Sequence, residues 1–402
     1  MVGSARSVEK LNSINFVVRD RSVLLPIHRS SRHTPPLEIR PVRKSILFAA
    51  ILACLMLCQS ALSAQEKTGA AKKQSNGQRK TGGKAQGNPP MAAAKAFLAT
   101  LDDAQRTRAS VDYQSNLRVG WHFIPKPSRK GLPLMDMDAE QQAAAKALLR
   151  AAVSQLGFNK ATTIMQLEAI LLQLEGPKEP PTRNPEKYYF TLFGTPAKGQ
   201  TWGLSVEGHH LSLNFSLQGN KIVDSTPQFM GSNPAKLNAS FGEKFPKGFR
   251  VLGQEEQLGF DLVKSLDEKQ LATATLPGEV PEEIRAAGEA QPSTAAAAGI
   301  AASELNSDQQ ATLKKLIEVY SAKMKTGVAK QRWTLIDQAG FDKVKFAWAG
   351  AMEPGIGHYY RIQGDTFVIE FINVQADAEG NPANHIHCIW RDLQGDFNLP
   401  IK

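Results

Sequence analysis

The chain contains only 3 cysteines in 402 residues, which excludes the disulfide-rich class of small secreted domains. Cys54 and Cys58 both lie in one apolar run near the N-terminus, so Cys388 would be the single cysteine left after removal of an export signal. We therefore expect no intrachain disulfide in the mature protein.

The body of the chain also lacks an excess of basic residues, although the formal net charge of the whole chain is +10. Residues 1–90 hold 15 of the 48 Lys and Arg but only 4 of the 38 Asp and Glu, so the remainder is close to neutral. A basic face is the electrostatic mark of nucleic-acid binding. We therefore expect no nucleic-acid partner.

The apolar run from Ile46 to Cys58 is too short to span a bilayer, which takes about 20 residues. It follows Arg43-Lys44 and precedes Ala61-Leu62-Ser63-Ala64, the order of charged, apolar and small residues found in secretory signal peptides. We predict export to the periplasm or the extracellular space, with no transmembrane segment in the mature chain. A buried helix is the alternative, and a lipoprotein anchored through Cys54 is a weaker one.

Composition divides the chain into successive regions. We predict that residues 1–64 are an N-terminal extension and signal peptide, with the true start near Val42, and that residues 65–90 are a disordered basic linker rich in Lys, Gln, Gly and Ser. Residues 91–275 and 301–402 form two α+β halves of one compact body. Residues 276–300, rich in Pro, Glu and Ala, are predicted as a linker between the halves.

Helical and strand patterns alternate along the body. Helices are predicted over 143–156, after a capping box at Asp138, over 161–174, and after capping boxes that start at Ser265 and Ser307. Strand patterns cover residues 188–217 and 346–371. These elements place the protein in the α+β class.

The two strand regions resemble each other, which indicates an internal duplication. Gly194, Gly199, Gly208 and Phe215 have counterparts 156 residues later at Gly350, Gly355, Gly364 and Phe371. In the helices upstream, Gln141 has a counterpart in Gln309, at the longer offset of 168. We predict two related halves, each a helix followed by a β-hairpin unit.

Each half would contain a two-residue hairpin turn with glycine first, at Gly208-His209 and at Gly364-Asp365. This register pairs Glu207 with His210, Val206 with Leu211, and Trp202 with Phe215. Alternation then assigns one set of side chains to the core: Trp202, Leu204, Val206, Leu211, Leu213 and Phe215. The opposite face carries a polar set: Ser205, Glu207, His210, Ser212 and Asn214.

The chain has no glycine-rich phosphate loop, no GxSxG elbow and no HExxH motif. His385 and His387 are two residues apart, so on a strand both would point to one face and could bind one divalent metal ion. His210 is the predicted third ligand, and Glu207 is a further ligand or a general base. The alternative is that these are hydrogen-bonded structural residues and that Glu207 and His210 form a cross-strand pair. We expect His358 to be structural.

Other polar residues near the strands could also act on a ligand. Arg361 and Arg391 could clamp a carboxylate or a phosphate, although ion pairs with Glu370 and Asp392 are the simpler expectation. Tyr359 opposite Glu370 could form an acid/base pair, although a plain hydrogen bond is more common. Cys388 is expected to point away from the two histidines. Catalytic candidates are thus Glu207, Arg361 and Tyr359.

Several stretches together resemble the bacterial and fungal family catalogued as domain of unknown function 3500. They are Arg183-Asn184-Pro185-Glu186-Lys187-Tyr188-Tyr189, Trp202-Gly203, Glu207 to Phe215, Gly231-Ser232-Asn233-Pro234-Ala235, His358 to Gly364, and His385 to Asp392. The resemblance spans nearly all of residues 91–402. It implies export, because members often carry a signal, and it brings no catalytic residue to this chain.

Two functions are consistent with these residues. The first is an exported metal-dependent enzyme that acts on a small polar substrate, with its site between the two halves. The second is a non-catalytic exported protein, either a binding protein for a small polar ligand or a structural protein of the envelope. Neither the metal nor the oligomeric state can be read from the sequence.

Overall fold

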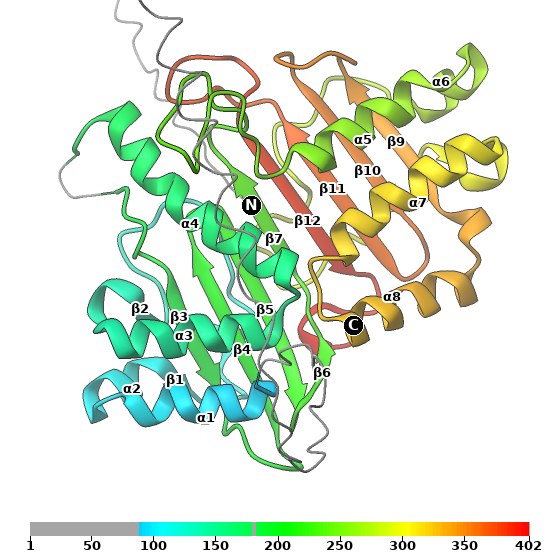
Figure 1. Ribbon diagram of the computed structural model, residues 1–402. Helices are drawn as coiled ribbons and strands as arrows, with labels where there is room; N and C mark the ends of the chain where they lie inside the picture. Colours follow the sequence, from blue (N-terminus) through cyan, green and yellow to red (C-terminus); the bar gives the residue numbers. More distant parts are fainter. Residues whose placement is uncertain (1–87, 179–181, 402) are drawn as a thin grey trace, which may run out of the picture. The chain divides into compact units, whose positions relative to one another are not determined.

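A computed structural model describes residues 88–178 and 182–401. The predicted signal peptide, Cys54 and nearly all of the predicted 65–90 linker lie outside the described residues. The described chain contains eight α-helices and a twelve-stranded mixed sheet, which confirms the α+β class (Figure 1).

The bounds of the elements are as follows. The helices are α1 (Pro90–Thr100), α2 (Asp103–Ala109), α3 (Ala139–Ala152), α4 (Gln155–Glu175), α5 (Gly253–Lys264), α6 (Glu268–Ala274), α7 (Ser307–Ser321) and α8 (Thr326–Ala339). The strands are β1 (Ser110–Val111), β2 (Leu132–Pro133), β3 (Tyr189–Phe193), β4 (Thr201–Gly208), β5 (Leu211–Gln218), β6 (Lys221–Asp224), β7 (Gln228–Ser232), β8 (Ile300–Ala301), β9 (Lys345–Gly350), β10 (His358–Gln363), β11 (Phe367–Asn373) and β12 (Ile386–Asp392).

Four of the helices begin with the same capping box, in which an Asp or Asn side chain accepts from the backbone of a Gln three residues later. The predicted cap at Asp138 is confirmed. The predicted caps at Ser265 and Ser307 are wrong, because Asp267 and Asn306 hold those positions. In both cases the spacing of Asp or Asn to Gln, rather than the nearby serine, sets the first residue of the helix.

The capping glutamines also join neighbouring helices. Gln105 and Gln141 exchange two side-chain hydrogen bonds of 3.0 and 2.7 Å, which tie the start of α2 to the start of α3. Gln270 and Gln309 make the same pair at 3.0 and 2.8 Å between α6 and α7. These matching pairs are consistent with the predicted duplication, which we retain as an inference.

The strands follow the order β1-β3-β4-β5-β7-β12-β11-β10-β9-β8. The first half supplies the sheet up to β7 and the second half supplies it from β12, so the antiparallel β7–β12 pair joins them. Figure 1 shows the helices lying across one face of this sheet. The site described below depends on that central pair.

The predicted hairpin register is wrong by two residues. Gly208 pairs with Leu211, so the turn is His209-His210, and Glu207 faces Ser212 rather than His210. His210 adopts a φ of 59°, which a non-glycine residue rarely does, and this allows the two-residue turn to form at His209-His210. The second hairpin is shifted likewise, with Gln363 facing Val368.

A shift of two residues leaves every side chain on its predicted face, because the strand period is two. The predicted core set is therefore confirmed: Trp202, Leu204, Val206, Leu211, Leu213 and Phe215 are all buried with helix side chains in one large cluster. A smaller cluster, which includes Phe229, Tyr359 and Ile389, lies on the opposite face. That face is covered by irregular chain rather than by helices.

Two irregular segments cover this second face. Residues 119–131, which we call the strap, bring Trp121 and Phe123 into the smaller cluster. Residues 276–299, within the predicted linker, contribute Ile284 and form polar contacts with the sheet: Arg285 pairs with Glu370 and the Ala286 carbonyl accepts from Arg391. These residues are packed chain with little regular structure.

None of the helices in the described ranges 88–178 and 182–401 combines the length and the apolar character that crossing a membrane requires.

Replacing Leu213 by Ala should lower the free energy of unfolding by about 2–5 kcal/mol, because this side chain is fully buried between β5 and the helices. Leu117→Ala is the control: Leu117 is 53% exposed, and its loss should cost less than about 0.5 kcal/mol. Urea unfolding monitored by circular dichroism measures both. Equal midpoints for the two variants would contradict the assigned face of β5.

Candidate functional site

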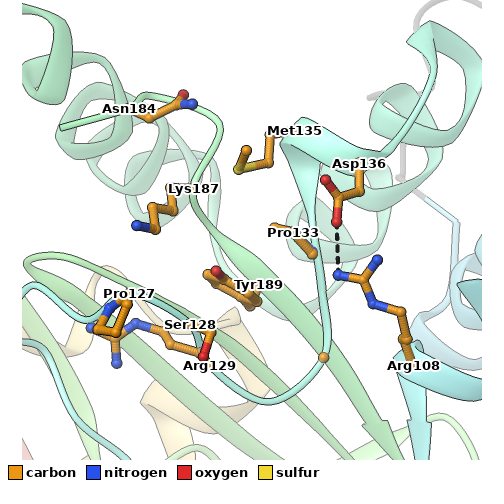
Figure 2. A pocket seen from close by; sticks show the side chains of 11 residues that line it. Arg108, Pro127, Ser128, Arg129, Pro133, Met135, Asp136, Asn184, Lys187 and Tyr189 are labelled. Carbon is orange, nitrogen blue, oxygen red and sulfur yellow. Dashed lines mark hydrogen bonds and ion pairs between the residues drawn. The ribbon is translucent and has the colours of Figure 1, made fainter. Parts of the chain in front are cut away.

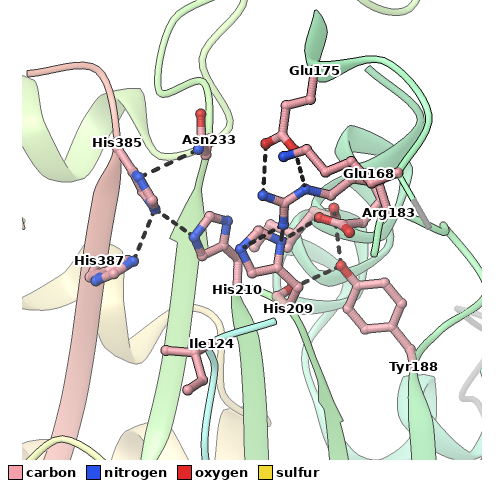
Figure 3. Close-up of polar contacts among 12 residues, drawn as sticks. Ile124, Glu168, Glu175, Arg183, Tyr188, His209, His210, Asn233, His385 and His387 are labelled. Carbon is pink, nitrogen blue, oxygen red and sulfur yellow. Dashed lines mark hydrogen bonds and ion pairs between the residues drawn. The ribbon is translucent and has the colours of Figure 1, made fainter. Parts of the chain in front are cut away.

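Three histidines from distant parts of the chain converge on the strap side of the sheet (Figure 3). His210 Nε2 lies 2.7 Å from His385 Nε2, which in turn lies 3.1 Å from His387 Nε2. One nitrogen from each ring falls within 4.8 Å of the others, so the group could hold a metal ion. The three residues predicted as ligands are thus brought together.

The central strand pair produces this convergence. His387 on β12 pairs directly with Gly231 on β7, and the Gly231 amide donates to the His210 carbonyl at 2.8 Å. The His210 amide donates to the Phe123 carbonyl of the strap at 2.9 Å, which fixes the turn. His385 stands immediately before β12, so strand alternation directs it to the same side as His387.

Gly231 leaves the space that the His210 ring occupies. A Cβ at residue 231 would lie 2.9 Å from His210 Cδ2 and 3.0 Å from the Ile386 carbonyl oxygen. Neither group can move easily, because the first belongs to the cluster and the second to the backbone of β12. The absence of a side chain here is therefore a steric requirement of the site.

Hydrogen-bond partners on the far side of the rings orient two of the histidines. Both carboxylate oxygens of Glu283 lie within 2.9 Å of His387 Nδ1, so this nitrogen carries the proton and Nε2 keeps its lone pair. The Asn233 amide lies 3.4 Å from His385 Nδ1, and its Oδ1 is buried without another partner in the described chain. Exchanging the amide O and N would let Oδ1 accept from His385 Nδ1.

A second polar network supports His210 through its neighbour. The His209 ring stacks on the His210 ring with 3.7 Å between centroids. Glu168 on α4 lies 2.5 Å from His209 Nδ1, and Arg183 contacts the same ring. Arg183 is itself held by both carboxylate oxygens of Glu175 at the end of α4. This network fixes the turn against α4 (Figure 3).

The surroundings favour the neutral forms of His210 and His385. Burial lowers the pKa of His210 well below its ordinary value, and the neighbouring histidines lower it further. Burial and the nearby His387 likewise lower the pKa of His385 to about 3. Burial also lowers the pKa of His209, although the hydrogen bond to Glu168 opposes this. Neutral imidazole is the form that binds metal ions.

The predicted catalytic candidates lie outside this group of ligand atoms. Glu207 forms a buried ion pair with Lys130, 2.7 Å between Oε1 and Nζ. Tyr359 is two strands away from His387, in the row that runs through Ile372, and its hydroxyl donates to Glu370 at 2.7 Å. Burial, together with Glu370, raises the pKa of Tyr359. Arg361 lies beside Glu370 on β10, and its Nε has no partner in the described chain.

Two expected ion pairs form with other partners. Glu370 pairs with Arg285 rather than with Arg361, because the 276–299 segment reaches over β10 and β11. Arg391 pairs with Asp396 at 2.6 Å, while Asp392 pairs with Arg332 of α8. Cys388 faces the helix side of the sheet, away from the histidines, as expected. His358 is fully buried against Trp348 and Phe260, also as expected.

The residues that orient the histidines were not identified from sequence. Glu283 lies within the irregular 276–299 segment, and Glu168 lies on a helix face that appeared merely amphipathic. Asn233 was noted only as part of a matching stretch. Glu168 and Asn233 are buried and Glu283 is half-buried, and the burial of a single Glu or Asn cannot be read from one sequence.

Comparison with known proteins gives the family. The model of the family described as "Protein of unknown function (DUF3500)" matches residues 84–399, so the chain belongs to that family. No curated protein and no solved structure matches the chain.

Gly231→Ala should displace the His210 ring and lower the free energy of unfolding by about 1–3 kcal/mol, because the new methyl group has no room. Long-range ¹H–¹⁵N spectra of the histidine rings would report the displacement. Gly120→Ala is the matched control, since its Cβ would meet nothing closer than 3.8 Å. An unchanged His210 signal in the Gly231 variant would refute the steric role.

Proposed function

We propose that this member of the DUF3500 family is an exported, metal-dependent enzyme for a small polar substrate, with His210, His385 and His387 as the metal ligands. The observation that carries the proposal is the convergence of three histidine rings, with one nitrogen from each within 4.8 Å of the others. With Nδ1 of His387 bound to Glu283, the Nε2 lone pair of His387 faces His385 Nε2 at 3.1 Å. This gap accommodates either the ring proton of His385 or a bound cation, and metal analysis distinguishes the two.

The spacing of the donor nitrogens can be compared with that of a zinc site. Bonds of about 2.0–2.1 Å to a tetrahedral zinc ion imply nitrogen separations of about 3.3 Å. The observed separation of 3.1 Å is close to this value, whereas 2.7 Å is a hydrogen-bond distance and all three atoms lie within 4.8 Å, so a bound ion would move His210 and His385 slightly apart. Burial lowers the pKa of His210 and of His385, which favours the neutral rings that can act as metal ligands.

Three imidazole ligands are typical of catalytic rather than structural zinc sites, because a fourth position stays open. Imidazole also suits copper, iron and nickel, so the ligands alone do not select one ion. A bound ion of this kind supplies Lewis acidity at its open coordination position. Glu283 would orient the His387 ring and raise its basicity, and the stacked His209 would hold the His210 ring in place.

Export is part of the proposal and rests on the N-terminal sequence. The charged, apolar and small residues from Arg43 to Ala64 have the order of a signal peptide. Glu207, Tyr359 and Arg361 stay candidate catalytic residues, to be tested once a substrate is known.

A non-catalytic exported binding or envelope protein is the second candidate. The observation that favours it is the buried ion pair between Glu207 and Lys130, which neutralises the predicted general base. The two candidates differ in metal content and in turnover. An envelope protein would need neither, and a binding protein could hold a metal without turnover.

The purified full-length protein should contain about one divalent metal ion per chain, and the His385→Ala/His387→Ala variant should contain almost none. At a metal concentration of 100 Kd the ion should stabilise the wild type by about 2.7 kcal/mol. Elemental analysis and thermal unfolding measure the two effects. His122→Ala serves as the control, because this histidine lies outside the cluster. A wild type without metal, and without a change in Tm on metal addition, would refute the proposal.

Glu283→Ala should weaken metal binding about 10–100-fold, because His387 loses the acceptor that orients its ring. Glu283→Gln should weaken it less, since the amide oxygen can still accept from Nδ1. The adjacent Glu282→Gln, which changes an exposed side chain, should leave affinity unaltered. Competition with a chromogenic chelator gives the affinities. Equal values for the Glu283 and Glu282 variants would exclude an orienting role.

A further inference from the structure

A second site lies beside the strap, on the same side of the sheet as the histidines. A pocket of about 580 Å³ opens between residues 127–131 of the strap, β2, the start of β3 and Arg108 of α2. Figure 2 shows Tyr189 in the middle of this pocket, with Lys187 on one side and the Arg108–Asp136 pair on the other. Its volume is in the range of small-molecule sites, about 300–1,000 Å³.

Arg129 lines this pocket, and its positive charge has no carboxylate partner among the described residues. Its guanidinium donates to two backbone carbonyls of the strap, to His122 at 2.7 Å and to Ile124. No carboxylate among residues 88–178 and 182–401 lies within ion-pair distance of it. Burial therefore lowers the pKa of Arg129, and the more distant Glu207 only partly offsets this. Arg129 is half-buried, and a cation partly removed from water without an anionic partner is destabilising.

The carboxylates nearby are already bound to other cations. Glu207 pairs with Lys130, the next residue along the strap, at 2.7 Å. Asp136 pairs with Arg108 at 2.7 Å across the pocket (Figure 2). The described residues that line the pocket therefore provide no carboxylate to pair with Arg129.

The other lining groups suit the oxygen atoms of an anion. Tyr189 is 6% exposed and brings a phenol to the centre of the pocket. Ser128 and Asn184 add a hydroxyl and an amide, and Lys187 contributes an ammonium group to the wall. Guanidinium, ammonium and hydroxyl donors together are the usual partners of carboxylate and phosphate oxygens.

We infer that this pocket binds the oxyanion group, carboxylate or phosphate, of a small molecule through Arg129 and Tyr189. The site is separate from the histidine cluster and does not depend on a metal there. Arg129 also donates to the carbonyls of His122 and Ile124, on either side of Phe123, whose own carbonyl fixes the His210 turn. An anion bound to Arg129 would therefore act on the part of the strap that positions His210.

Isothermal titration of the full-length protein with inorganic phosphate, succinate and neutral glycerol tests this site. We expect one of the two anions, or both, to bind in a salt-sensitive manner, and glycerol not to bind. Phosphate alone would assign a phosphate site and succinate alone a carboxylate site, whereas binding of both would assign a general oxyanion site. The titrations are repeated on the His385→Ala/His387→Ala variant, because an anion could otherwise bind at a metal ion.

Arg129→Met should weaken anion binding at least tenfold, and Tyr189→Phe should weaken it severalfold while removing one hydrogen bond with the Arg129 backbone. Lys126→Met is the matched control, since it removes one positive charge from the exposed part of the same strap outside the pocket. If Arg129→Met does not fold, Tyr189→Phe decides the question alone. The inference is overturned if the wild type binds neither anion, or if anion binding disappears in the double histidine variant. It is also overturned if Tyr189→Phe binds the anion as well as the wild type does, or if Lys126→Met binds it as weakly as Arg129→Met does.

Discussion

The antiparallel pairing of β7 with β12 is the constraint on which the rest of the structure depends. It joins the two halves into one sheet, and it places Gly231 opposite His387. On its other side, the Gly231 amide donates a hydrogen bond to the carbonyl of His210. A shift of this pair by one residue would turn His387 toward the helices and leave His210 without partners. The histidine cluster is therefore a consequence of one strand register.

The polar groups of the strap side need irregular chain to cover them. Helices cover the apolar face, where alternating side chains of β4 and β5 meet them. On the other face, the strap and the 276–299 segment supply backbone carbonyls, Lys130, Arg285 and Glu283 at the points where the sheet presents charge. Because irregular chain can direct individual groups inward, it can satisfy buried polar residues that a helix face would leave unpaired.

Local periodicity predicted the elements and their faces, since both depend only on neighbouring residues. It also brought His210, His385 and His387 into one hypothesis. The hairpin register was missed because His210 accepts a left-handed backbone that sequence assigns to glycine. The partners of Arg391 and Glu370 were missed for another reason: they are set by segments far away in sequence, whose packing no local pattern specifies.

The separation of the histidines along the chain also governs when the site can exist. His210 and His385 are 175 residues apart, and His387 belongs to the last strand of the sheet. A growing chain that has completed the first hairpin carries one of the three ligands and no means of placing the others. The cluster therefore arises only after β12 has been synthesised and paired, so an ion could be captured only by a protein whose folding is almost finished.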